Sequence, residues 1–200
     1  MKATLLVVPV TALAALLLCL LSQHSPRVAA VAPPTKSQLK AELSKLANSV
    51  AKKYPQYSSY TSTVKKYLGL ALNSKYDLSV LANATILIPT NTEAEALLKK
   101  LPFKKTNIPK IYNITAFHLL RIRRFMPQLK ALKPGQAVGT QLKQALYKFN
   151  PVNAPRVSFG RTRKAPASTW TTIVNPRMYA GPYFVAHGVN KVLIPSGTKV

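Results

Sequence analysis

The chain has 200 residues, of which 29 are lysine or arginine and only four are aspartate or glutamate, so its formal net charge is +25. So few carboxylates argue against chemistry that needs two positioned acids, such as glycoside hydrolysis, and a single cysteine cannot build a disulfide framework. The seven glycines are scattered singly and form no phosphate-binding loop. These features predict a protein that is not an enzyme, uses no cofactor and binds an anionic partner.

The first 30 residues have the pattern of a secretory signal peptide. Lys2 precedes an apolar run over residues 3–21, and small residues suited to cleavage stand at 28–30. The run is also long enough for a membrane anchor, which is the alternative. We predict cleavage near Val31, which removes Cys19 and leaves a secreted chain with a net charge of about +23.

About 170 residues remain after cleavage, a length that suits one domain whose core needs no disulfide. We predict a short extended lead over residues 31–35, a domain over residues 36–196 and a tail over residues 197–200. The chain ends five residues after Pro195, so we expect neither a lipid-anchor signal nor a transmembrane segment in the mature chain.

Two helices are predicted before the first strand. Thr35 and Gln38 have the spacing of a capping box, in which each side chain bonds the backbone N–H of the other residue. Apolar residues then recur at helical spacing as far as Val50. A second amphipathic segment covers residues 57–72.

A buried strand joined directly to a helix follows. Residues 85–88 are β-branched and apolar, and Pro89, which lacks an N–H, ends the strand. Thr92 and Glu95 have the spacing of another capping box, so the helix is predicted to begin at Thr92. Glu93 and Glu95 lie in its first turn, where the helix dipole favours negative charge, and we interpret both as structural.

The remaining chain is predicted to form short strands with brief helices. A helix over 111–116 leads into a strand over 117–122, and a helical turn covers 127–132. Further strands are predicted at 138–142, 146–149, 156–159, 171–174, 183–189 and 191–194, with breaks at Asn175-Pro176 and Gly181-Pro182. Helices first and mixed short strands later predict an α+β fold.

Three segments resemble the fasciclin domain. The strand that runs into Pro89, Thr90 and Asn91 and then into a leucine-containing helix resembles the first motif of that family. Residues 114–120 resemble its Tyr-His segment, and residues 184–195 resemble its closing motif. The chain departs from the family pattern at Ile88, where alanine is usual, and at Phe117, which replaces the tyrosine and so lacks its hydroxyl.

This resemblance implies the fasciclin fold, a small twisted β-wedge or sandwich flanked by short helices, in a single-domain secreted protein of the plant type. It also implies that Thr90, Asn91, His118 and His187 are structural motif residues. Members of the family act in cell adhesion and in the organisation of the extracellular matrix or cell wall. We therefore expect an extracellular location, which in a plant is the apoplast or the cell wall.

His118 and His187 are the histidines of the predicted mature chain, and both stand in apolar runs. A metal-binding pair is one interpretation. However, zinc and copper sites need three or four ligands, and none of the four acidic residues has ligand spacing to either histidine. We interpret both as packed, hydrogen-bonded core residues and predict no metal.

Two Asn-X-Thr sequons, at Asn83 and Asn113, become glycosylation sites if the chain enters the secretory pathway. Asn83 precedes the buried strand in a polar loop, whereas Asn113 lies in a predicted helix. We predict a glycoprotein modified at both positions.

Basic residues form clusters with scarcely any acidic residue between them, which predicts a positive potential over most of the surface. The expected partners are acidic polysaccharides, matrix or cell-surface glycans and other cell-surface proteins. The residues assigned to anionic-polymer binding are Lys99, Lys100, Lys104, Lys105, Lys110, Arg121, Arg123 and Arg124.

A basic nucleic-acid-binding or antimicrobial protein is the alternative function. Aromatic residues such as Tyr112, Phe125 and Tyr147 interleave with the basic ones and could stack on bases. The predicted signal peptide favours an extracellular partner, so we expect no nucleic-acid ligand.

Overall fold

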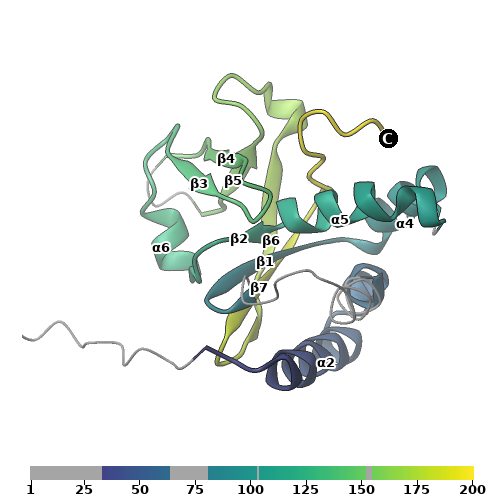
Figure 1. The fold of residues 1–200 in the computed structure, drawn as a ribbon. Helices are drawn as coiled ribbons and strands as arrows, with labels where there is room; N and C mark the ends of the chain where they lie inside the picture. Colours follow the sequence, from purple (N-terminus) through teal and green to yellow (C-terminus); the bar gives the residue numbers. More distant parts are fainter. Residues whose placement is uncertain (1–32, 64–80, 103, 152–154) are drawn as a thin grey trace, which may run out of the picture. The chain divides into compact units, whose positions relative to one another are not determined.

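The computed structural model describes residues 33–63, 81–102, 104–151 and 155–200. These belong to one compact unit, Pro33–Val200 (Figure 1). The predicted signal peptide and most of the predicted second helix lie outside the described residues. Of that helix, the structure describes a 3-10 turn, η1 (Pro55–Tyr57), and a helical segment over residues 58–63.

Seven strands form a mixed sheet in the order β2-β1-β7-β6-β5-β4-β3. β1 and β7 run parallel, and every other neighbouring pair is antiparallel. The strands are β1 (Ala84–Pro89), β2 (Leu119–Leu120), β3 (Ala137–Gly139), β4 (Ala145–Lys148), β5 (Ser158–Gly160), β6 (Thr171–Ala180) and β7 (Phe184–Val189).

The two edges of this sheet meet, so the sheet closes on itself. Leu120 of β2 forms an antiparallel bridge with Thr140, which directly follows β3. On either side of the bridge, the Arg121 N–H donates to Gly139 O and the Gln141 N–H donates to Leu119 O. Closure pairs backbone groups that an open sheet edge would leave exposed.

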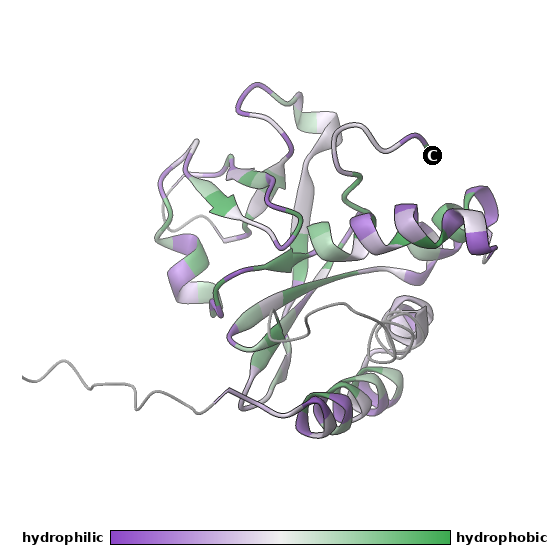
Figure 2. Cartoon of the chain, viewed as in Figure 1, coloured by the Kyte–Doolittle hydropathy of each residue, from purple (hydrophilic) through white to green (hydrophobic). Residues whose placement is uncertain are grey.

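β1 and β7 are neighbours in the sheet, and all six residues of each are buried. Because side chains alternate along a strand, β1 contributes to two different cores. Ala84, Ile86 and Ile88 join a core with the first helix, whereas Leu87 joins a core within the closed part of the sheet. A strand covered on both faces is largely apolar, as Figure 2 shows for these strands, and the buried polar exceptions are Thr85 and His187.

Helix α2 (Lys36–Lys53) covers one face of these strands. Its capping box is confirmed: the Gln38 N–H donates to Thr35 Oγ1 at 3.2 Å and the Thr35 N–H donates to Gln38 Oε1 at 2.8 Å. Figure 2 shows hydrophobic and hydrophilic residues on opposite sides of this helix. The buried apolar side chains are the predicted ones, Leu39, Leu43, Leu46 and Val50.

Helices α4 (Asn91–Lys100) and α5 (Ile108–Phe117) share a third core. Its buried members are Leu97, Leu101, Ile111 and Ile114. The shorter helical elements are η3 (Lys105–Asn107), α6 (Met126–Lys130) and η4 (Ala167–Thr169). No helix in the described part of the chain has the length and apolar character needed to cross a bilayer.

The mixed architecture confirms the predicted α+β class, but several boundaries were wrong. The capping box at Thr92 does not form: α4 begins at Asn91, after the N-cap residue Thr90. The Glu95 carboxylate instead accepts a hydrogen bond from Ser59 Oγ at 2.8 Å. A tertiary contact has therefore replaced the local one.

The predicted strand over 117–122 is reduced to Leu119 and Leu120. Phe117 ends α5, and the His118 N–H donates back to Ile114 O and Thr115 O, which closes the last helical turn.

The strand predicted at 191–194 is absent, because the Leu193 N–H donates to the His118 ring rather than to a neighbouring strand. The break predicted at Asn175-Pro176 is instead a pair of register shifts within β6.

Candidate functional site

His118, which caps α5, is fully buried. The Leu193 N–H donates to its Nε2 at 3.0 Å, so the ring proton lies on Nδ1, which donates to Ile114 O at 2.8 Å. Burial lowers the pKa of His118 to about 4, although the bond to Ile114 partly offsets this effect. A neutral ring with both nitrogens occupied joins α5 to the C-terminal segment.

His187 uses the opposite tautomer on β7. The Arg177 N–H donates to its Nδ1 at 2.9 Å, so Nε2 carries the proton and donates to Arg124 O at 3.0 Å. Burial lowers the pKa of His187, and the bond to Arg124 opposes that shift. The ring therefore joins the segment after β2 to the irregular part of β6.

A pocket of about 520 Å³ lies beside these two segments. Its walls combine an aromatic ring, three prolines, a methionine and two cationic side chains. The lining residues are Phe125, Met126, Pro127, Lys130, Pro155, Pro176 and Arg177.

Two guanidinium groups contact the aromatic ring of this pocket. The centre of the Arg123 guanidinium lies 5.2 Å from the Phe125 ring centroid, and that of Arg177 lies 5.9 Å from it. These are cation–π distances. The Arg123 side chain also donates to Pro182 O at 3.1 Å.

Sequence reasoning found only part of this pocket. Arg123, Arg124 and Lys130 stand in a conspicuous basic run, whereas Arg177 has no basic residue beside it in the sequence. The predicted strand break, Asn175-Pro176, directly precedes Arg177. In the structure, that irregularity is what brings Arg177 to the pocket.

The eight residues assigned to anionic-polymer binding fall into two groups in the fold: five lysines around the α4–α5 connection and three arginines that follow β2. The lysines of the first group are all exposed, around the end of α4 and the start of α5. They are Lys99, Lys100, Lys104, Lys105 and Lys110.

The arginines of the second group follow β2 and are more constrained. Arg121 is exposed and donates through Nε to Thr140 O at 2.9 Å. Arg123 and Arg124 are half-buried. This group lies next to the pocket, whereas the first group does not line it.

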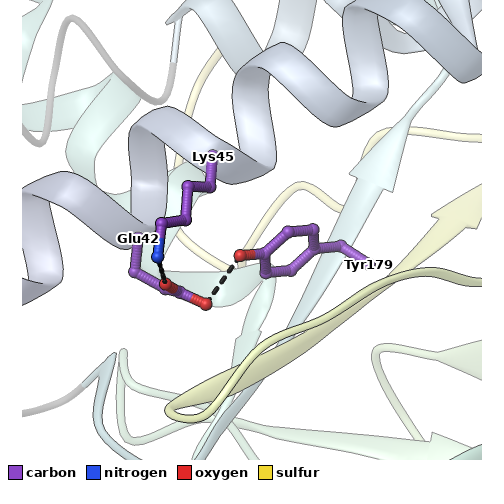
Figure 3. A network of polar contacts seen from close by, with 3 residues as sticks. All are labelled: Glu42, Lys45 and Tyr179. Atoms are coloured by element: carbon purple, nitrogen blue, oxygen red, sulfur yellow. Dashed lines mark hydrogen bonds and ion pairs between the residues drawn. The ribbon is translucent and has the colours of Figure 1, made fainter.

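The carboxylates that the structure describes are largely engaged. Glu42 is buried, accepts a hydrogen bond from the Tyr179 hydroxyl at 2.6 Å and pairs with Lys45 at 3.4 Å (Figure 3). Burial and the adjacent carboxylate both raise the pKa of Tyr179. The Glu95 carboxylate accepts a hydrogen bond from Ser59 Oγ. Glu93 lines a smaller cavity of about 240 Å³.

The remaining predicted residues occupy distinct settings. Asn91 binds the preceding segment, because its side chain accepts from the Ser59 N–H at 2.9 Å and donates to Pro55 O at 2.9 Å. Asn83 is exposed, with a left-handed φ of 63°, immediately before β1. Asn113 is half-buried on α5. Glycosylation of both sequons stays a prediction.

No group of three or more histidine, cysteine, aspartate or glutamate side chains lies close enough to hold a metal ion within the described ranges. His118 and His187 each make hydrogen bonds through both ring nitrogens.

No protein-family model matches the chain, and no curated protein matches it either. Among solved structures, the chain is similar to a FAS1 domain pair from the insect cell adhesion molecule fasciclin I, with 14% sequence identity and a TM-score of 0.46. The match covers 77% of this chain and 46% of that structure. The chain thus spans less than half the length of the structure it resembles.

Proposed function

We propose that the protein is a secreted fasciclin-like adhesion module that attaches to acidic polysaccharide of the extracellular matrix or cell wall. The sequence motifs around Thr90-Asn91, His118 and His187 support a fasciclin-like module. The excess of basic over acidic residues supports an acidic polysaccharide as the ligand. Glycosylation at Asn83 and Asn113 belongs to the same proposal, because it requires export.

The observation that carries the proposal is the imbalance between exposed cations and engaged carboxylates. All five lysines around the α4–α5 connection are exposed, whereas Glu42 is buried and Glu95 is hydrogen-bonded. A surface with so few free carboxylates attracts polyanions over its whole extent. Repulsion among its own cations is relieved when such a polymer binds.

The test removes four charges from this cluster. Replacing Lys99, Lys100, Lys104 and Lys105 by Gln should shift elution from a polygalacturonate column to lower NaCl concentration. Because all four side chains are exposed, the free energy of unfolding should change by only about 0.5 kcal/mol per site or less.

A matched control removes the same charge from α2. Lys36, Lys40, Lys52 and Lys53 are also exposed, and their replacement by Gln changes the net charge equally. We expect this control to elute at higher salt than the cluster variant. If the two variants elute together, net charge alone explains retention and the assignment to this cluster is wrong.

A further inference from the structure

Two segments far apart in the sequence form the walls of the 520 Å³ pocket, and His187 holds them together. Its Nε2–H donates to Arg124 O, and the adjacent Phe125 lines the pocket. Its Nδ1 accepts from the N–H of Arg177, which also lines the pocket. The pocket is therefore fixed by a buried side chain of β7.

The backbone at Arg177 is strained in a way that serves the pocket. Its φ is 53°, in the left-handed region that non-glycine residues rarely adopt, within the register shift of β6 between Asn175 and Tyr179. Such a conformation persists only where surrounding contacts hold it. Here the hydrogen bond to His187 holds it, and the irregularity redirects the side chain as bulges commonly do.

The chemistry of the walls selects an anion attached to an apolar body. Arg177 and Lys130 supply two cations, and no carboxylate is among the lining residues that the structure describes. Within the described ranges, neither side chain makes an ion pair, and the Arg177 guanidinium lies over the Phe125 ring. The Arg177 side chain is also exposed, and the N–H donors of a guanidinium match the geometry of a planar carboxylate.

The remaining walls are unsuited to a bare inorganic ion. Phe125, Met126 and the proline rings present apolar surface that a small hydrated anion would leave uncovered. A sugar ring has C–H faces that can cover it. The volume of about 520 Å³ lies within the range of small-ligand pockets.

We propose that this pocket seats one carboxylated sugar unit of an acidic polysaccharide, with its carboxylate on Arg177 and Lys130 and its ring against Phe125 and the prolines. This assignment rests on the proposed function and adds a defined subsite to it. The α4–α5 lysines then act on the polymer through charge, whereas the pocket recognises one unit through shape and a paired carboxylate.

The experiment measures the binding of trigalacturonate to the whole secreted protein by calorimetry at low salt. Fully methyl-esterified trigalacturonate is the ligand control. We expect the acid to bind and the neutral ester to bind at least about tenfold more weakly, since the ester loses the charge-assisted hydrogen bonds. Equal binding of acid and ester would overturn the proposal.

Protein variants test the same subsite. Arg177→Gln and Lys130→Gln should each weaken trigalacturonate binding about tenfold, whereas Lys199→Gln removes an equal charge from the C-terminal tail and should leave it unchanged. Lys130→Gln keeps the test valid if Arg177→Gln fails to fold, which circular dichroism would reveal. Unchanged binding in Lys130→Gln and in any folded Arg177→Gln protein would refute the assignment.

The two proposals can fail separately. If long polygalacturonate binds but the trimer does not, the pocket assignment is wrong while attachment by surface charge survives. If the parent protein does not bind the long polymer, the proposed function fails. A sulfated disaccharide that binds while trigalacturonate does not would overturn the carboxylate assignment.

Discussion

At the scale of single residues, the hydrogen-bond partners of the two buried histidines require each imidazole ring to be uncharged. His118 accepts a hydrogen bond from the Leu193 N–H and donates one to Ile114 O. If Nε2 also carried a proton, its N–H and the Leu193 N–H would be two donors pointing at each other. The ring therefore fits its site only when it is uncharged.

This arrangement predicts a pH dependence of stability. The pKa of His118 is about 4 in the folded protein and about 6.5 when exposed, so between these values the unfolded chain binds more protons. Stability should therefore fall as the pH is lowered from 6.5 to 4, by about 3 kcal/mol. Urea unfolding at a series of pH values measures this directly.

The control is His118→Gln, which cannot titrate. His187, whose pKa is also lowered, remains in both proteins, so the difference between the two curves isolates His118. The variant should be less stable at pH 7 but lose less stability on acidification. Parallel curves for parent and variant would contradict this account of His118.

At the scale of elements, Lys148 joins β4 to α6 and the loops beside it. Its side chain is fully buried, and its Nζ donates to Lys130 O at 2.7 Å, Leu132 O at 2.6 Å and Pro151 O at 3.1 Å. Burial lowers the pKa of this lysine. Three carbonyl groups from two segments thus share one cation.

Lys148→Met should destabilise the fold by about 2 kcal/mol, because a side chain of similar length leaves those carbonyls without a donor. Lys133→Met is the matched control: Lys133 is exposed, so its replacement should change stability by no more than about 0.5 kcal/mol. Equal denaturant midpoints for the two variants would show that Lys148 does not hold these segments together.

The elements that could be predicted from the sequence are those decided by local contacts. The capping box of Thr35 and Gln38 joins residues three apart and formed as expected. The box at Thr92 and Glu95 had the same spacing, but Glu95 is bonded to Ser59, 36 residues away. A local pattern cannot show when a distant donor will compete for the same carboxylate.

The pocket was beyond prediction for a related reason. Phe125 and Arg177 meet because β7 lies between them in the fold and presents His187 to both segments. The basic run at Arg123 and Arg124 indicated one wall. The residues around Arg177 in the sequence did not indicate the second wall, because the left-handed backbone of Arg177 depends on a hydrogen bond to His187 on another strand.

At the scale of the whole molecule, charge is the property that most constrains function. A net charge of +25 with four carboxylates is visible in the sequence, but the structure adds that Glu42 is buried and Glu95 is hydrogen-bonded. The burial of Glu42 removes one carboxylate from the surface, whereas Glu95 is exposed and keeps its charge beside its hydrogen bond. Attachment through exposed charges weakens with salt, because they are screened beyond about 8 Å at physiological ionic strength.

The most direct test follows the full-length chain, with a C-terminal tag, in a secreting cell that deposits acidic polysaccharide. We expect the protein in the extracellular matrix fraction, beginning near Val31, carrying N-linked glycan and released from the matrix by NaCl. Recovery from the cytosol or nucleus with Met1 intact, or retention on the matrix that is indifferent to salt, would contradict the account.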